Sequence, residues 1–455
     1  MHIKRALLAL IVSAVYTSSL EASVVSLGTA LDSALLNNEQ VTMAGDRAEA
    51  ARARASQAFA GYLPSVSLSA NYSRNYSSPI ISEFKVGDID TPVTFGFNEP
   101  YDSKSWQASL TQNLFTFGKL ESRLSMAIES VRSAEEEYRS TRQSVIFDAV
   151  SSYFEVIRSE MALAYAKKAL DTAKAHFTQV EILRGRGRAS EAELLRARVA
   201  LLSAEQVLIK AENSARVAVS TFKSIAGMPG GSALVLAEKD LSRYMMKETR
   251  RFEAVTSEAY ERHPDLRRAK SAVRISESAL TLAKSNWLPS VAAQGNYGWN
   301  NTNYSSSGTN FDQTNWSVAA GASWTLFDGF DTQSRIKEAS VSLSEARASL
   351  SLAAKAASLE LERAYLDHEA ASKVRDLAAK TLESARAGHE ASLIRFRHGL
   401  ASNIELLDAQ SSLSRAELDL VSADFDLCMS YLRLKKASGT LDRSVFSSAG
   451  EVNAE

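Results

Sequence analysis

Hydrophobic and polar residues alternate one by one in four short segments of this chain. The first segment runs from Ser65 to Tyr76 and reads SVSLSANYSRNY, and the others surround Trp106, Val291 and Trp316. A period of two residues over about 10 to 12 positions is typical of a transmembrane β-strand. The alternation therefore predicts strands at about 65–76, 104–116, 290–300 and 314–326.

Two much longer stretches repeat their apolar or small residues every 3.5 positions instead. From Leu120 to Val145 the spacing alternates between 4 and 3, and the stretch from Ile336 to Ala357 keeps the same frame. This period predicts helices that supercoil left-handedly against neighbouring helices. Because no proline interrupts either stretch, nothing in them breaks a helix. We expect helices at about 118–184, 191–226, 330–396 and 403–437.

The two halves of the chain carry the same pattern, which indicates an internal repeat. Tyr62-Leu63-Pro64-Ser65-Val66 recurs 225 positions later as Trp287-Leu288-Pro289-Ser290-Val291. Further along, Gly187 and Gly399 are 212 positions apart, as are the Leu-Phe pairs that precede the long helices. The predicted organisation is a first repeat at 23–230 with a tip turn at 185–190, a linker at 227–250, a second repeat at 251–441 with a tip turn at 397–402, and a tail at 442–455.

The N-terminus has the features of an export signal. Lys4 and Arg5 precede an apolar run, and small residues follow up to Ala22, so we expect a cleavable signal peptide at 1–22. A membrane anchor is the alternative, but about ten apolar residues fall short of the ~20 that span a bilayer. No later stretch reaches that length without charges, so we expect no transmembrane helix, and membrane residence would rest on the strands.

Composition narrows the functional classes. Lys+Arg 52 and Asp+Glu 53 leave a net charge of -1, which argues against nucleic-acid binding. The six histidines show no metal-ligand spacing, and no nucleophile or phosphate-loop motif is present, so we expect no enzyme activity, cofactor or metal. Cys428 is the only cysteine, so we expect neither an intrachain disulfide nor a lipid anchor on an N-terminal cysteine.

The predicted strands require other copies of the chain if they lie in a membrane. Four strands cannot close a barrel, and an open edge in hydrocarbon leaves backbone groups unpaired at a cost of several kcal/mol each. Symmetric closure by identical subunits satisfies them. The polar linkers 77–103 and 301–313 are expected to be external loops. A soluble hairpin with one face on a core is the alternative for any single strand.

All five tryptophans lie in or beside the predicted strands. Aromatic residues gather at both interfaces of transmembrane barrels. We therefore expect an interfacial role for six aromatic residues, which are Trp106, Trp299, Trp316, Trp324, Tyr72 and Tyr297.

In this order, and in duplicate, the motifs resemble the TolC family of outer-membrane efflux and secretion channels, over about Leu27 to Leu441. The motifs are the two Leu-Pro-Ser-Val strand entries, the Leu-Phe pairs before the long helices, and the turn RHGLAS at 397–402 with IELLDAQ at 404–410. The resemblance implies a homotrimer with four strands per chain in a twelve-stranded β-barrel. It also implies a coiled-coil α-helical barrel that continues into the periplasm of a Gram-negative bacterium, with the linker in an equatorial belt.

The resemblance further implies a passive duct for efflux or type I secretion in the outer membrane. Its helix turns would dock a periplasmic adaptor (a membrane fusion protein) and an inner-membrane transporter. The expected docking residues are Gly187, Arg188, Ala189, Ser190, Gly399, Leu400, Ala401 and Ser402. The alternative is an exported periplasmic coiled-coil scaffold or adaptor without a channel.

The turns also predict local structure. Ser190 with Glu193, and Ser402 with Glu405, match the capping box that starts a helix. Glu405 and Asp408 share one helix face. By resemblance they line a periplasmic constriction, where a trimer would offer six carboxylates that favour cations. The alternative for these two residues is a helix cap and a solvated surface. Glu193 is a further candidate there, with a cap as its alternative role.

The sequence departs from the family at the residues that hold the tip closed. Well-known members use a tyrosine and an arginine, and the matching positions here are Phe396 and Ala401. Neither side chain can make those links. The candidate substitutes are Arg395, Arg397 and His398 in the second copy and Arg186 and Arg188 in the first.

Overall fold

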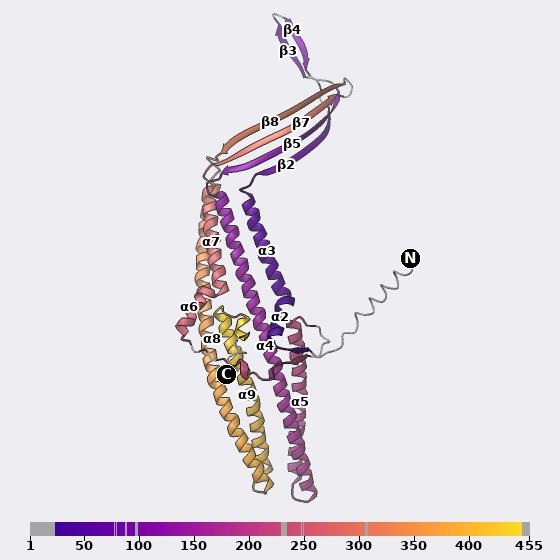
Figure 1. The fold of residues 1–455 in the computed structure, drawn as a ribbon, viewed down its shortest axis with the longest axis vertical. Helices are drawn as coiled ribbons and strands as arrows, with labels where there is room; N and C mark the ends of the chain where they lie inside the picture. The colour runs from indigo at the N-terminus through magenta and orange to yellow at the C-terminus, as the bar shows by residue number, and fades with distance from the viewer. Residues whose placement is uncertain are drawn as a thin grey trace, which may run out of the picture. The chain divides into compact units, whose positions relative to one another are not determined.

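The computed structural model describes residues 23–76, 78, 80–86, 89–95, 99–228, 234–246, 248, 250–304 and 308–447. The predicted signal peptide at 1–22 and the end of the predicted tail, 448–455, lie outside the described residues. The chain forms two compact units, and Figure 1 labels their elements. The helical unit comprises Met1–Ala48, Ala134–Ala269 and Leu350–Glu455, and the sheet unit comprises Glu49–Ser133 and Lys270–Ser349. Each unit thus draws on both sequence repeats.

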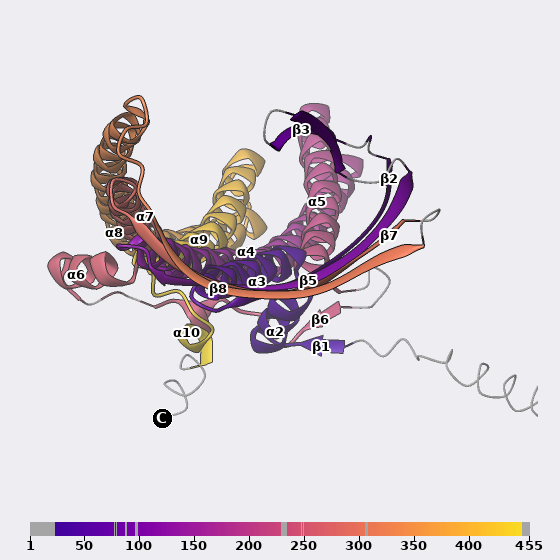
Figure 2. The same cartoon turned by 90° about the horizontal axis from the view of Figure 1, so that it is seen from above.

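The sheet unit contains a four-stranded antiparallel sheet, drawn as one curved layer in Figure 2. β2 (Ser65–Tyr76) pairs with β5 (Pro100–Phe115), β5 with β7 (Ser290–Tyr304), and β7 with β8 (Thr309–Ser323). The β5–β7 pairing joins the strands of one repeat to those of the other. Among the described residues, the edge strands β2 and β8 each pair with one neighbour.

The pairing register puts the apolar positions of the four strands on one face. One row across the sheet is Val66, Leu110, Gly295 and Val318, and the next is Leu68, Ala108, Tyr297 and Trp316. The opposite face is polar, and Gln107 Nε2 donates to Asn296 Oδ1 over 3.1 Å there. The apolar face is uncovered in the single chain, since Leu68, Trp316 and Val318 are 74%, 75% and 78% exposed.

Both predicted loops between these strands are shorter than expected. At 77–103 the chain forms a hairpin of β3 (Ile80–Val86) and β4 (Ile89–Phe95), and β5 begins at Pro100. At 301–313, β7 continues to Tyr304 and β8 starts at Thr309. Gly, Asn, Ser, Asp and Pro favoured loops, but a strand in register with a neighbour overrides such local preferences.

Four helices contribute residues to both units: α3 (Glu39–Ala60), α4 (Lys119–Gly185), α7 (Pro264–Ser285) and α8 (Asp331–Arg397). α4 and α8 have 67 residues each. The 3.5-residue pattern faces inward as its period requires, because Leu120, Val145 and Leu343 are buried. In the sheet unit, α7 joins α4 and α8 through Arg274–Glu129 and Arg347–Glu277 ion pairs of 3.4 and 3.0 Å.

The remaining elements belong to the helical unit. Its helices are α2 (Leu27–Asn37), α5 (Glu191–Ile225), α6 (Phe252–Arg262), α9 (Asn403–Ala437) and α10 (Ser444–Ser447). The strands β1 (Ser23–Val25) and β6 (Leu234–Leu236) form a parallel pair. Of the predicted linker 227–250, the structure describes β6 and the 3₁₀ helix η1 (Ser242–Tyr244), while 229–233, 247 and 249 lie outside the described residues. No described helix combines the length and the apolar character needed to cross a membrane.

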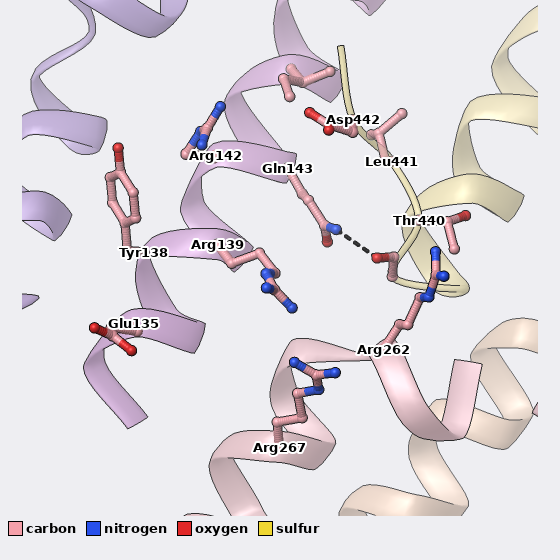
Figure 3. Close-up of a pocket in the computed structure, with 12 residues that line it drawn as sticks. Glu135, Tyr138, Arg139, Arg142, Gln143, Arg262, Arg267, Thr440, Leu441 and Asp442 are labelled. Carbon is pink, nitrogen blue, oxygen red and sulfur yellow. Dashed lines mark hydrogen bonds between the residues drawn. The ribbon is translucent and has the colours of Figure 1, made fainter. Parts of the chain in front are cut away.

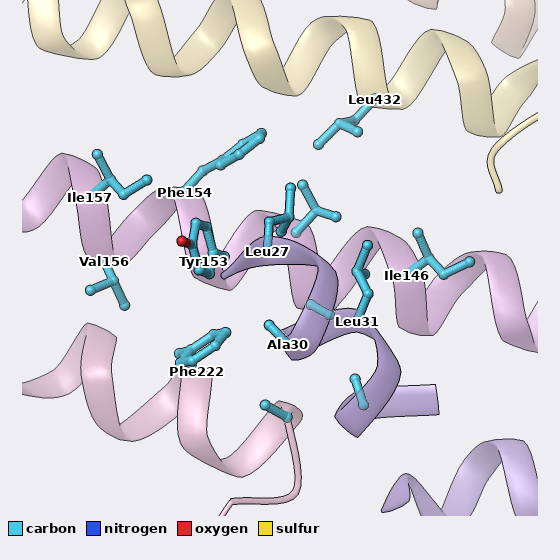
Figure 4. Packing of buried hydrophobic residues seen from close by; sticks show 14 of the residues in the cluster. Leu27, Ala30, Leu31, Ile146, Tyr153, Phe154, Val156, Ile157, Phe222 and Leu432 are labelled. Atoms are coloured by element: carbon cyan, nitrogen blue, oxygen red, sulfur yellow. The ribbon is translucent and has the colours of Figure 1, made fainter. Parts of the chain in front are cut away.

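The core of the helical unit lies where α2, α4, α5 and α9 meet (Figure 4). Tyr153 and Phe154 of α4 are fully buried, and the ring of Tyr153 stands edge-on to Phe222 of α5 at 5.6 Å. The Tyr153 hydroxyl donates to Glu238, so its burial leaves no unpaired polar group. Residues of both repeats therefore share one core.

The two helix pairs of the helical unit end alike. α4, α5, α8 and α9 are followed by Gly187, Gly227, Gly399 and Gly439, all with φ between 64 and 72°. After each glycine, the next N–H donates to the carbonyl five residues back, as from Thr440 to Lys435 over 3.0 Å. This is the Schellman motif, which needs a left-handed residue that glycine adopts without strain.

Gly439 has a second constraint that Gly399 lacks. A Cβ atom at Gly439 would lie 2.8 Å from the carbonyl oxygen of Arg262, whereas nothing lies within 4 Å of one at Gly399.

We expect Gly399→Ala to cost about 1 kcal/mol of unfolding free energy through backbone strain. Gly439→Ala should cost about 1–3 kcal/mol more, through overpacking. Thermal unfolding followed by circular dichroism measures both, and equal losses would contradict the packing assigned to Gly439.

Candidate functional site

The two helix turns of the helical unit hold all eight predicted tip residues. One turn joins α4 to α5 and the other joins α8 to α9. Ala189 and Ala401 are half-buried in their turns, and the other six are exposed. These six are Gly187, Arg188, Ser190, Gly399, Leu400 and Ser402.

The first turn ends in the complete capping box that the sequence predicts. The Ser190 hydroxyl oxygen accepts from the Glu193 N–H at 3.3 Å, and the Glu193 carboxylate accepts from the Ser190 N–H at 2.7 Å. The bond from this N–H, and then one from the hydroxyl, lower the pKa of Glu193 below its ordinary value. The structure thus places Glu193 in a cap, with its carboxylate directed at its own turn.

The second capping box is only half formed, contrary to the prediction. Ser402 Oγ accepts from the Glu405 N–H at 3.2 Å, but the Glu405 carboxylate does not return to Ser402. It pairs instead with the guanidinium of Arg395, 2.9 Å away at the end of α8. A charged partner competes better for a carboxylate than a neutral N–H, which explains the difference. Arg395 also donates to the Leu400 carbonyl at 3.3 Å.

Asp408 lies one turn further along α9, exposed, and three positions from the half-buried Glu405. Glu405 forms an ion pair with Arg395, whereas Asp408 forms no ion pair with another described residue. On this helix face, the negative charge of Asp408 is therefore the one without a cationic partner in the described chain. Their shared face follows from the spacing on α9. The assignment of either residue to a constriction stays a proposal.

A buried polar contact that the sequence did not reveal joins α4 to the start of α9. His176 and Asn403 are 6% and 5% exposed, and the His176 ring nitrogen Nε2 hydrogen-bonds to Asn403 Oδ1. The ring of Phe396, which takes the place of the family's tyrosine, packs on His176 at 5.7 Å between centroids. Burial lowers the pKa of His176. His176 had no predicted role, because the histidines lack metal-ligand spacing. Its position on the inward face of α4 is the only signal in the sequence that could have indicated a buried contact.

A second contact joins the same two helices. Lys168 Nζ of α4 lies 3.0 Å from Glu417 Oε1 of α9, and the Glu417 side chain is only 5% exposed.

Of the five proposed substitutes for the family's closing residues, Arg395 makes the contacts given above. The other four, Arg186, Arg188, Arg397 and His398, are exposed and form no ion pair with another described residue.

The predicted interfacial aromatics occupy two levels of the sheet unit. Trp106 and Trp299 are paired across β5 and β7, and Tyr297 pairs with Trp316 in the next row. Tyr72 lies on the same face, one row beyond Trp106. Trp324 follows β8, and its Nε1 donates to the Trp287 carbonyl at 2.9 Å. Eight residues at ~3.4 Å each separate Trp316 from Trp324, or roughly 27 Å along the strand.

Among the described residues, no group of three or more His, Cys, Asp or Glu side chains is placed to hold a metal ion. The predicted site residues lie on surfaces, namely the two helix turns and the apolar sheet face with its aromatic rings.

Comparisons with known proteins agree with this arrangement. The model of the outer membrane efflux protein family matches residues 30–228 and 255–440. The outer membrane protein TolC of Vibrio cholerae is 26% identical over 409 residues, covering 89% of this chain and 88% of its own length. The alkaline protease secretion protein AprF of Pseudomonas aeruginosa is 22% identical, covering 90% of this chain and 84% of its own. The crystal structure of the Campylobacter jejuni CmeC outer membrane channel superposes with a TM-score of 0.76 at 19% identity, covering 93% of this chain and 89% of that one.

The fold is that of outer-membrane channel proteins, and members of this class are channels rather than enzymes. The chain belongs to the outer membrane efflux protein family, and hence to the TolC-type channels of the Gram-negative outer membrane.

The buried His176 predicts a pH dependence of stability. The folded chain favours the neutral ring, so as pH falls below about 6.5 the unfolded chain takes up a proton that the folded chain resists. The free energy of unfolding should therefore decrease below that pH. His176→Gln cannot titrate and should lose less stability between about pH 7.5 and 5.5, as thermal unfolding would measure. His398→Gln, at an exposed position in the second turn, is the matched control and should behave as wild type. If His176→Gln keeps the pH dependence of wild type, the buried His176 is not its cause.

Proposed function

We propose that three copies of this chain form one passive duct for efflux or type I secretion, made of a twelve-stranded barrel in the outer membrane and a helical tunnel in the periplasm. The observation that carries the proposal is the uncovered apolar face of the sheet, whose edge strands β2 and β8 lack a second neighbour among the described residues. Lipid would cover the face, and neighbouring copies would pair the edges.

The strand directions support closure by identical chains. Since every neighbouring pair in β2-β5-β7-β8 is antiparallel, β2 and β8 run in opposite directions. β8 of one copy can therefore pair with β2 of the next and keep the whole barrel antiparallel. With strands tilted by ~35–45°, the roughly 27 Å between the two aromatic levels gives roughly 20 Å of barrel height, comparable with the ~25 Å apolar band of such barrels.

The helical unit has two apolar seams of its own that favour neighbours. On α5, Leu195, Leu202 and Ile209 recur every seven residues and are exposed. On α8, Leu352, Leu359 and Leu366 do the same. Seven-residue repeats are the signature of coiled-coil packing. We propose that α5 of one copy packs on α8 of the next and closes the tunnel.

In this assembly the exposed helix turns would face the periplasm and dock the adaptor and the inner-membrane transporter. Their exposed Leu400, at 70%, and the cations Arg188 and Arg397 offer apolar and charged contacts for a partner. The alternative of a periplasmic scaffold or adaptor is disfavoured, because it would leave the apolar sheet face in water.

Asp408 and Glu405 would form the selective constriction of the duct. Three copies bring six carboxylates together, and the three of Asp408 have no compensating Arg395. We expect Glu405→Gln with Asp408→Asn to abolish most of the cation preference of single channels. Asp408→Asn alone should account for more of the loss than Glu405→Gln alone.

Reversal potentials in planar bilayers under a salt gradient measure this preference. Glu193→Gln is the comparison variant, since the Glu193 carboxylate is engaged in its cap, and its channels should stay close to wild type. Unchanged selectivity in the double variant would show that the six carboxylates do not select cations. A protein that forms no channels at all would refute the duct.

A further inference from the structure

A cavity of about 600 Å³ lies in the helical unit, between α4, the junction of α6 with α7, and the segment that follows α9 (Figure 3). Its lining is rich in cations. The charged residues of the lining are Arg139, Arg142, Arg262, Arg267, Glu135 and Asp442. The lining holds four guanidinium groups and two carboxylates, and two further carboxylates outside the lining, Glu136 and Glu258, pair with three of the four arginines. The proposed duct gives this cavity no role.

Three of the arginines come from different elements and meet at one opening. Arg139 lies on α4, Arg262 ends α6, and Arg267 lies in the first turns of α7. Figure 3 shows their guanidinium groups around the same space. Like charges gathered in this way repel one another, and carboxylates of the chain or of a bound anion offset that repulsion.

Carboxylates behind the cavity orient these arginines without neutralising them all. Glu136 pairs with Arg267 at 2.9 Å and also with Arg139 at 3.4 Å, so one negative charge serves two cations. Arg267 Nε donates to the Glu261 carbonyl at 2.7 Å, and Arg262 pairs with Glu258 at 3.1 Å. The guanidinium forks are thus held in position before a ligand arrives, which lowers the entropy cost of binding.

The opposite wall is fixed as well. The buried Gln143 donates from Nε2 to the carbonyl of Gly439 at 2.9 Å. Gly439 lies so close to the backbone of Arg262 that no larger residue has room. The segment 439–442 is therefore held against the end of α6, and the width of the cavity is set by backbone contacts.

Arg142 provides a cation that no described carboxylate compensates. Its guanidinium carbon lies 5.8 Å from the centroid of the Tyr138 ring, and Tyr138 also lines the cavity. A cation–π contact leaves the charge and most of the N–H donors of arginine available. The wall thus offers both anion-binding donors and an aromatic surface.

We propose that this cavity binds a small polyanion, with two or more carboxylate or phosphate groups. Its volume is in the ~300–1,000 Å³ range of small-ligand sites. Arginine forks bind carboxylate and phosphate groups alike through paired N–H donors. Arg142, together with Arg139 and Arg267, which share the single carboxylate of Glu136, would leave N–H donors for two acidic groups of a ligand.

Isothermal titration calorimetry on the full-length protein in detergent at low ionic strength tests the site. Pyrophosphate and citrate are the probes, and their affinities separate a phosphate ligand from a carboxylate ligand. We expect saturable binding of at least one probe, weakened at least tenfold by Arg139→Gln or Arg267→Gln. Arg142→Gln breaks no ion pair among the described residues and should also weaken binding, so it decides the question if the other variants unfold.

Arg188→Gln is the matched control, because Arg188 is an exposed arginine in the first turn, outside the cavity. Its affinity should equal that of wild type. Absence of saturable binding for both probes would overturn the proposal, and so would an equal loss of affinity in the control and the cavity variants.

Discussion

The rest of the structure depends on one constraint, which is that the four-stranded sheet cannot bury its apolar face within its own chain. Val318 and Trp316 are more than two-thirds exposed, and the strands β2 and β8 have open edges within the described chain. Exposed apolar area of this kind costs about 25 cal/mol per Å² in water, and unpaired edges invite association. A membrane and further copies of the chain remove both costs together. In the proposed assembly, the seams on α5 and α8 would gain partners from the same copies.

The internal repeat gives the chain two similar helix pairs whose turns differ in chemistry. Both turns contain a glycine with φ of 72° and the same backbone hydrogen bonds. In the first, Glu193 closes a cap, whereas in the second Arg395 draws Glu405 away. His176 and Lys168 of the first repeat bind Asn403 and Glu417 of the second. The two copies thus share the backbone of the turn and differ in the side chains that pair there.

Much of the local structure could be predicted from periodicity, and contacts between distant segments could not. The alternation in 65–76 and the unbroken 3.5-residue pattern from Leu120 mark β2 and α4, because side-chain periods of strands and helices differ. The hairpin β3–β4 was missed because its polar and proline residues resemble a loop. The His176–Asn403 contact and the arginine cavity join residues more than a hundred positions apart, and a single sequence carries no signal of such pairing. The second capping box was predicted wrongly because Arg395, ten residues before Glu405, competes for its carboxylate.

The number of chains in the assembled protein tests the account most directly. Native mass spectrometry of the protein extracted from membranes in mild detergent would give this number. The account predicts a particle of three chains that stays intact until the detergent is replaced by a denaturant. A particle of one or two chains would contradict it, because the proposed barrel takes four strands from each of three chains.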